Sequence, residues 1–217
     1  MKEYVIDAKD MNEKELNRAI KEKATSFDKL IIDNPDSRHN ICAGLTEDVE
    51  IEINGSAGYF VGTMAHGPRI HINGNAGWFA GDNMTEGELV IEGTAGDGAG
   101  QGIYGGTVIV KGNVGSRTGE IMKGGTVIIG GNSGFMTGLL MMGGKLIILG
   151  DVTEDVGESI MRGTIFVLGQ VKSLGKNAVM EYATAEDLKE LKETLTEYGF
   201  ELSDNDYVNF KKIVNMQ

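Results

Sequence analysis

The sequence predicts an all-β solenoid: a right-handed parallel β-helix of about seven to eight coils with 19-residue repeats, capped by helices at both ends. Two observations predict it, because glycines recur every 19 residues and each repeat contains one short apolar run. A chain of 217 residues, of which 41% are hydrophobic, can bury the core of one such domain. Its 33 glycines and 2 prolines fit a fold with many tight turns.

The main glycine column continues without insertion or deletion over the whole repeat region. Its members are Gly55, Gly74, Gly93, Gly112, Gly131, Gly150 and Gly169. A second column consists of Gly62, Gly81, Gly100, Gly119, Gly138 and Gly157. A third column, broken at Thr153, consists of Gly58, Gly77, Gly96, Gly115 and Gly134. We expect these glycines to adopt positive φ angles or to permit close approach between neighbouring coils.

The apolar run of each repeat predicts one β-strand, because it is short, rich in β-branched residues and bounded by glycine. The runs are 70–72, 89–91, 108–110, 127–129, 146–148 and 165–167. Nineteen residues are too few for a strand, a helix and two loops, so successive strands must run parallel, one coil apart, at about 4.8 Å. Right-handed winding is the rule for parallel crossovers.

Other columns assign the interior and the turns of the predicted solenoid. A second apolar wall consists of Met84, Ile103, Met122, Met141 and Ile160. Exchange of methionine with isoleucine in this column indicates core packing and not a soft-metal site. Short polar residues follow the main glycines and are expected to bond the turn backbone as a ladder: Ser56, Asn75, Thr94, Asn113, Asn132 and Asp151.

The repeat divides the chain into three parts: an N-terminal helical cap (1–27), the β-helix (28–172) and a C-terminal helical cap (173–217). Helical spacing from Asn12 to about Ala24 predicts the first cap, and Ile32 extends the 19-residue period backward from Ile51.

The C-terminal cap is predicted from a second helical pattern. Thr184 and Asp187 form a capping box, followed by a stripe of Leu188, Leu191 and Leu195. We expect a last short helix around residues 204–213.

The outward residue of each strand changes character along the chain. It is polar at Glu52 and His71, and then apolar at Val90, Ile109, Ile128, Ile147 and Phe166. Because so long an apolar ridge would be an unusually large exposed patch, something must cover it. The C-terminal helix is the first candidate, and a partner subunit or a second copy is the alternative.

A group of aromatic and methionine residues lies between the first and second glycine columns, where we expect the coil to turn a corner. This group is the candidate interface. Its members are Tyr59, Phe60, Trp78, Phe79, Phe135 and Met136. Aromatic residues and methionine are enriched in the cores of protein contacts, so we expect a partner to bind here.

Charge and cysteine content exclude several classes of function. A formal net charge of −12 disfavours nucleic acid and anionic membrane surfaces as partners. The single cysteine, Cys42, excludes a disulfide within the chain and cysteine-ligated clusters. The N-terminal residues do not look like a signal peptide and no stretch of about 18 apolar residues exists, so we expect a cytoplasmic protein.

The segment GDGAGQGIYGG, which contains Gly96, Gly98, Gly100 and Gly102 at alternate positions, resembles the GXGXG β-helix domain of the large subunit of glutamate synthase. The resemblance covers roughly residues 51–169 and is shared with one subunit of formylmethanofuran dehydrogenase and one of methylglutamate-forming enzymes. It implies a free-standing structural subunit without catalytic residues or a cofactor of its own. The implied partners are a glutamine amidotransferase subunit and a synthase subunit that carries FMN and iron–sulfur clusters; self-association into a homo-oligomer is also open.

The residues themselves predict no catalytic, cofactor-binding or metal site. Gly96–Gly102 leads into another strand and not into the helix that a dinucleotide fingerprint requires, so the isolated chain should bind neither FMN nor nucleotides. His39, His66 and His71 form no ligand set. A solenoid acyltransferase is the enzymatic alternative, but its coil has 18 residues and a catalytic histidine.

Overall fold

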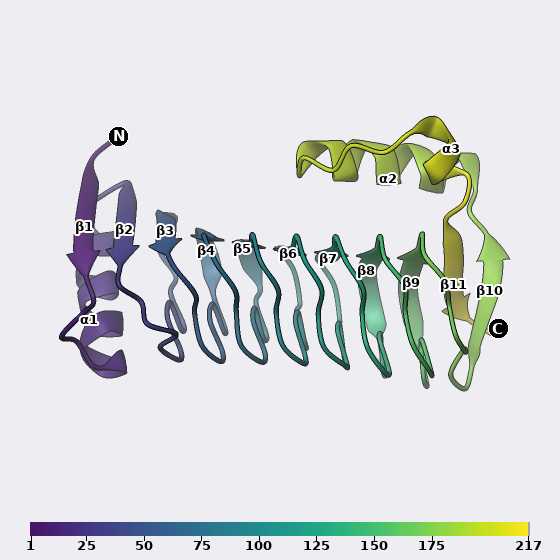
Figure 1. The fold of residues 1–217 in the computed structure, drawn as a ribbon, viewed down its shortest axis with the longest axis horizontal. Coiled ribbons are helices and arrows are strands. Elements are labelled where there is room, and N and C mark those ends of the chain that lie inside the picture. Colours follow the sequence, from purple (N-terminus) through teal and green to yellow (C-terminus); the bar gives the residue numbers. More distant parts are fainter. Residues whose placement is uncertain (217) are drawn as a thin grey trace.

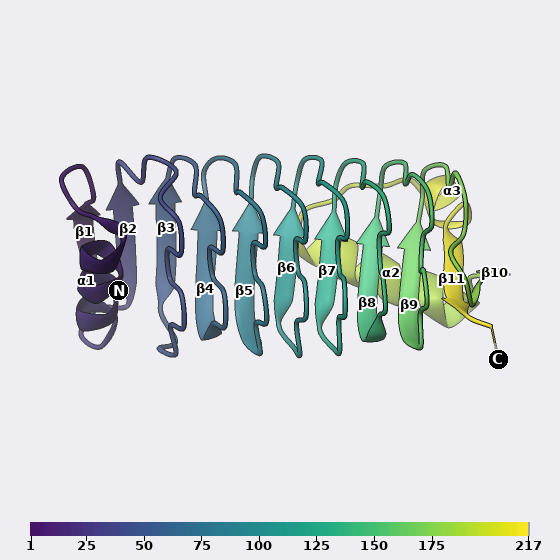
Figure 2. The ribbon, with the colours of Figure 1, turned by 90° about the horizontal axis from the view of Figure 1, so that it is seen from below.

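The computed structural model describes residues 1–216 and shows a parallel β-solenoid, so the predicted fold class is confirmed (Figure 1). Its repeat strands are β3 (Glu50–Asn54), β4 (His66–Ile72), β5 (Glu86–Ile91), β6 (Thr107–Val110), β7 (Thr126–Ile129), β8 (Met142–Ile148) and β9 (Arg162–Val167). Within the described residues, one sheet joins all the strands along the long axis of the molecule (Figure 2). None of the helices in residues 1–216 has the length and apolar character needed to cross a membrane.

At the core columns the register follows the predicted period in every step from β3 to β9, and it shifts by one residue only at the start of β4 and of β8. Ile70 lies beside Leu89, and Leu89 beside Val108, in neighbouring parallel strands. The first coil differs: β2 (Lys29–Asp33) places Leu30, and not Ile32, beside Ile51. The prediction that Ile32 occupies the column of Ile51 is therefore wrong, because this coil is two residues longer than the others.

The interior consists of the predicted apolar columns. Every residue of the second wall, Met84, Ile103, Met122, Met141 and Ile160, is at most 1% exposed. The predicted polar ladder also forms: the backbone N–H of Thr94 donates to Asn75 Oδ1 at 2.9 Å, and that of Asn132 donates to Asn113 Oδ1 at 2.8 Å. These bonds satisfy backbone donors between neighbouring coils.

The N-terminal end contains a strand as well as the expected helix. β1 (Glu3–Asp7) pairs in parallel with β2, so the sheet begins before the boundary at residue 28 that the sequence indicated. The helix α1 (Glu13–Ala24) is capped by Asn12, whose side chain accepts from the backbone N–H of Glu15. Its buried residues Leu16 and Ile20 join the main core and close this end of the solenoid.

The C-terminal helix covers the apolar outer ridge, as expected. α2 (Ala185–Glu197) begins at the predicted capping box of Thr184 and Asp187 and lies over the outer face of the later strands (Figure 1). Leu191 and Leu195, at most 2% exposed, pack in one cluster with the ridge. The ridge residues in this cluster are Ile109, Ile128, Ile147 and Phe166.

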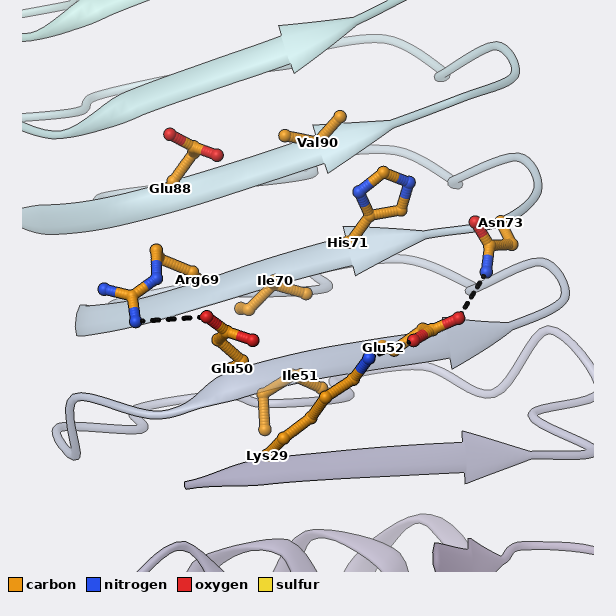
Figure 3. Close-up of a pocket in the computed structure, with 10 residues that line it drawn as sticks. All are labelled: Lys29, Glu50, Ile51, Glu52, Arg69, Ile70, His71, Asn73, Glu88 and Val90. Carbon is orange, nitrogen blue, oxygen red and sulfur yellow. Dashed lines mark hydrogen bonds and ion pairs between the residues drawn. The ribbon is translucent and has the colours of Figure 1, made fainter. Parts of the chain in front are cut away.

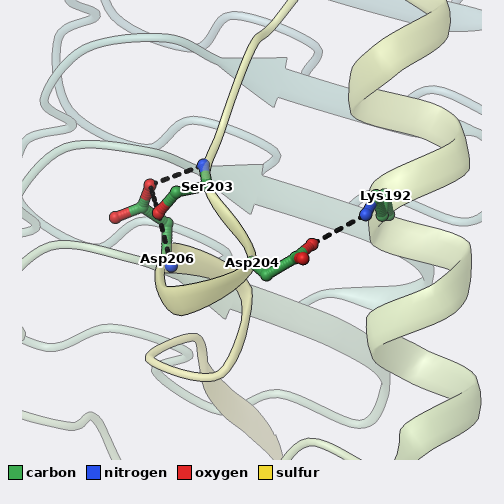
Figure 4. Close-up of polar contacts among 4 residues, drawn as sticks. All are labelled: Lys192, Ser203, Asp204 and Asp206. Atoms are coloured by element: carbon green, nitrogen blue, oxygen red, sulfur yellow. Dashed lines mark hydrogen bonds and ion pairs between the residues drawn. The ribbon is translucent and has the colours of Figure 1, made fainter.

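The segment after α2 differs from the predicted last helix. The helix expected around 204–213 is one turn, α3 (Asp204–Tyr207), and is followed by a strand, β11 (Lys211–Asn215). This strand lies antiparallel between β9 and β10 (Ala178–Tyr182). The Ser203–Asp206 capping box nucleates only that one turn, and the ion pair of Lys192 with Asp204 joins it to α2 (Figure 4). β11 continues the core instead, because its Ile213 pairs with Ile165 and is fully buried.

Candidate functional site

Each coil turns one corner through three alternate residues in the left-handed backbone region. In the predicted Gly-x-Gly-x-Gly segment these are Gly98, Gly100 and Gly102, with φ angles of 70°, 67° and 64°. In the preceding coil, Phe79 and Asn83 occupy the flanking positions at 59° and 53°. Between residues 60 and 159, only the coil of Gly98 has glycine at all three positions, and all three of these glycines are buried.

The middle position requires glycine for two reasons. At Gly100, an added Cβ would lie 2.5 Å from Val127 Cγ2 in the core, and the φ angle already disfavours an L side chain. Positive φ angles occur among the predicted structural glycines at Gly55, Gly62, Gly81, Gly98, Gly100, Gly102, Gly119, Gly138 and Gly157.

The other predicted structural glycines permit close approach between coils and do not have positive φ. They are Gly74, Gly93, Gly96, Gly112, Gly131 and Gly150. At Gly74, for example, an added Cβ would lie 2.7 Å from the carbonyl carbon of Gly55 in the coil before.

Two stacks of aromatic side chains follow the same corner. In the outer stack, the Tyr59 ring centroid lies 4.6 Å from that of His39 and 5.0 Å from that of Trp78. In the second, the Phe60 and Phe79 centroids lie 5.0 Å apart. Tyr59 is 39% exposed and Trp78 is 48% exposed, so much of the outer stack faces solvent. We call these five residues the aromatic ladder.

The structure brings together four of the six predicted interface residues. Phe135 and Met136 belong to the same two columns, three coils beyond Trp78 and Phe79, and are separate from the ladder. The sequence analysis did not place His39 in this group. The sequence feature that could have placed His39 in this group is its position 20 residues before Tyr59. This spacing differs from the 19-residue repeat.

A shallow pocket begins where the aromatic ladder ends. Its lining includes Trp78, Phe79, Gly98 and Arg117, which come from three successive coils. Three polar residues complete the lining: Asp97, Gln101 and Glu120.

A second groove lies on the outward face of β2 to β5 (Figure 3). Its charged side chains pair with one another: Lys29 Nζ lies 2.6 Å from Glu52 Oε2, and Arg69 Nη2 lies 3.5 Å from Glu50 Oε1. Glu52 raises the pKa of Lys29, and Lys29 in turn lowers the pKa of Glu52. These internal pairs are those expected of a solvated sheet face.

The histidines are distributed over different contacts. His66 and His71 lie 3.3 Å and 3.0 Å from the carboxylates of Glu86 and Glu92, whereas His39 accepts a bond from the backbone N–H of Tyr59. Within residues 1–216, no three His, Cys, Asp or Glu side chains are grouped as metal ligands.

Within residues 1–216, neither Cys42 nor the carboxylates of Glu154 and Glu158 belong to a reactive cluster. Cys42 is 1% exposed, and burial raises the pKa of its thiol to about 12, which opposes formation of the nucleophilic thiolate. Glu154 pairs with Lys172, and Glu158 accepts from the backbone N–H of Lys176 at 2.6 Å.

Comparison with known proteins gives one family. The model of the GXGXG motif family matches residues 7–203, which include the glycine columns and the aromatic ladder. No curated protein matches the sequence.

Proposed function

Because this chain belongs to the GXGXG motif family, we propose that it is a non-catalytic structural subunit of a glutamate synthase-like complex. In this role it holds together a glutamine amidotransferase subunit and a synthase subunit with FMN and iron–sulfur clusters. The observation that carries the proposal is the exposed aromatic ladder, which is rigidly stacked and built on the repeat itself. Rigid aromatic surfaces suit protein contacts because little side-chain entropy is lost when they are buried.

The distribution of reactive groups supports assembly over catalysis. General acid–base or nucleophilic chemistry needs groups that converge on one position, with pKa values matched to their task. Within residues 1–216, the paired carboxylates and cations lie at separate places on the sheet face and turns. The thiol of Cys42 is buried in the core.

The architecture also suits a scaffold. Rigid parallel coils keep surface groups at fixed separations, and the ladder residues lie at equivalent positions of successive coils. A partner that binds the ladder is therefore held in a defined orientation relative to both ends of the solenoid.

The test replaces the rings of the ladder and examines assembly and folding separately. The double variant Trp78→Gln and Phe79→Asn removes two rings, and asparagine tolerates the left-handed conformation at position 79. The matched control is Tyr104→Gln, which removes a 57% exposed ring elsewhere.

We expect the double variant to keep its melting transition within a few degrees of the parent and to separate from the native complex on size-exclusion chromatography. The control should remain in the complex. If the double variant assembles normally, or if the isolated parent chain turns over substrate, the proposal is wrong.

A further inference from the structure

At the C-terminal end of the sheet, the outer edge of β10 is unpaired among the described residues. β10 pairs with β11 on one side and is the last strand in the order of the sheet (Figure 1). At the opposite end, the edge strand β1 carries the charged residues Glu3 and Asp7. The sequence of β10, AVMEY, contains no proline or lysine and a single charge, at Glu181. β10 therefore has few of the features by which proteins protect an open edge.

The hydrogen-bond pattern of β10 determines which backbone groups face outward. In an antiparallel pair of strands, residue pairs that exchange hydrogen bonds alternate with pairs that do not. The backbone N–H of Met216 donates to the carbonyl oxygen of Asn177 at 2.7 Å, and these two residues continue the register of β10 with β11. Ala178, Met180 and Tyr182 therefore direct their backbone groups away from β11, toward the open edge.

Apolar side chains gather in solvent at the same end of the molecule. Met180 is 43% exposed and Tyr182 is 98% exposed. Val208, which lines the same shallow surface pocket, is 66% exposed. An extended strand fits this edge, because its backbone would bond to the outward groups while its side chains cover the apolar ones.

One antiparallel register of β10 with a second β10 uses these groups best. It places Met180 opposite Met180 of the other copy, and Tyr182 opposite Ala178. The N–H of Ala178 already donates to a carbonyl of its own chain, but its carbonyl oxygen can accept from Tyr182. The small side chain of Ala178 leaves room for the tyrosine ring. Glu181 then faces Val179, whereas a register centred on Glu181 would oppose two carboxylates, and one centred on Val179 would leave Tyr182 unpaired.

We propose that β10 pairs with β10 of a second copy of this chain, antiparallel and about a two-fold axis at Met180. The contact joins two solenoids at their C-terminal ends. A two-fold contact uses the same edge of both copies and closes at two, whereas pairing of β10 with β1 would continue into a filament. The inference goes beyond the proposed structural role, because such a dimer places two aromatic ladders in one particle.

The experiment is sedimentation equilibrium of the full chain over a range of concentrations. The salt concentration is about 0.15 M, which screens the repulsion between two acidic copies beyond roughly 8 Å. We expect twice the mass of the chain, with dissociation on dilution. A parent chain that remains monomeric overturns the proposal, as does a mass that grows beyond two copies.

A charged variant and its matched control locate the contact. Met180→Lys places two ammonium groups opposite each other across the axis and should raise the dissociation constant of the dimer at least roughly tenfold. The control, Val5→Lys, adds the same charge to a half-exposed residue of the opposite edge strand, β1, and should leave the dissociation constant unchanged. An equal effect of the two variants overturns the assignment to β10.

A mixing experiment tests the two-fold register itself. Met180→Glu should also dissociate, but an equimolar mixture of Met180→Lys and Met180→Glu should form dimers again, because position 180 opposes itself only about this axis. A mixture that stays monomeric shows that the register is wrong.

A further variant covers the possibility that the charged variants do not fold. Tyr182→Gln removes a ring that makes almost no contact within its own chain, so the melting transition should stay unchanged while the dimer weakens. Equal dissociation constants of parent and Tyr182→Gln overturn the proposal. Because no other subunit is present, failure here leaves the structural role to be judged by the assembly of the ladder variant.

Discussion

Lys212 of β11 donates a hydrogen bond to Asp187 of α2, with Nζ 2.8 Å from Oδ2, and both side chains are only 18% exposed. The contact joins the last strand to the helix that covers the outer ridge. Asp187 also accepts from the backbone N–H and the hydroxyl of Thr184 at the start of the helix. One carboxylate thus caps α2 and fixes it to the end of the sheet.

Because this carboxylate fixes α2 to the sheet, we expect acid to weaken the attachment of the C-terminal segment. Burial raises the pKa of Asp187, but the bonds from Lys212 and Thr184 outweigh it and hold the pKa below the ordinary 3.8. Lys192 likewise lowers the pKa of Asp204. A carboxylate whose pKa is lowered by folding stabilises the folded state at pH values above its ordinary pKa of about 3.8. This stabilisation is lost as the pH falls through the pKa of the folded state.

We therefore expect the amides of α2 to lose hydrogen-exchange protection below about pH 4, before those of the strands β6 and β7. Asp187→Asn should lower protection at pH 7 and flatten its acid dependence. Simultaneous loss of protection in α2 and the strands would show that the segment is not a separate unit.

The packing of α2 depends on its buried leucine stripe. Leu195 is fully buried against the outer ridge, whereas Leu188 is only partly buried. Leu195→Ala should destabilise the attachment of α2 by about 2–5 kcal/mol, and Leu188→Ala by less. Native-state hydrogen exchange measures both, and equal effects would contradict the observed packing.

Three glycines with similar φ angles separate backbone strain from crowding. Gly44, Gly119 and Gly100 have φ angles of 59°, 67° and 67°, but an added Cβ would meet its nearest atom at 3.8, 3.1 and 2.5 Å respectively. Alanine at position 44 should cost about 1 kcal/mol, from conformation alone. The cost should rise through Gly119→Ala to Gly100→Ala, and chemical denaturation curves give the order. Equal losses in all three variants would mean that crowding contributes nothing.

The buried thiol predicts an unreactive cysteine. Because burial raises the pKa of Cys42 to about 12, the native protein should resist a disulfide reagent at pH 8 and react stoichiometrically once it is unfolded. Rapid labelling of the folded chain would place Cys42 at an accessible position.

The central part of the fold was predictable because each coil repeats the same local rules. Apolar columns, glycine columns and the polar ladder at Asn75 and Asn113 all indicate one period, and the structure has that period. The register of the first coil was predicted wrongly, because its two additional residues shift Ile32 relative to Ile51. The strand β11 was not predicted, because its pairing with β9 joins residues that are far apart in the sequence.

The candidate surface was only partly predictable. Exposed rings at Tyr59 and Trp78 follow from position within the repeat, but their stacking and the addition of His39 require coordinates. The shallow pocket is lined by residues of three successive coils, from Phe79 to Arg117. A single sequence identifies Gly98 as a turn glycine and does not indicate that the Phe79 ring lies over it.

The most direct test of the structural role separates assembly from chemistry in the reconstituted complex. In the proposed complex, glutamine-dependent glutamate formation would need the amidotransferase and synthase subunits to be held together, whereas ammonia-dependent formation would need the synthase subunit alone. A chain that only holds partners acts through their effective concentration. The measurement compares both rates with and without this chain. The account predicts that omission lowers the glutamine-dependent rate and leaves the ammonia-dependent rate unchanged; equal loss of both rates, or no loss of either, would contradict it.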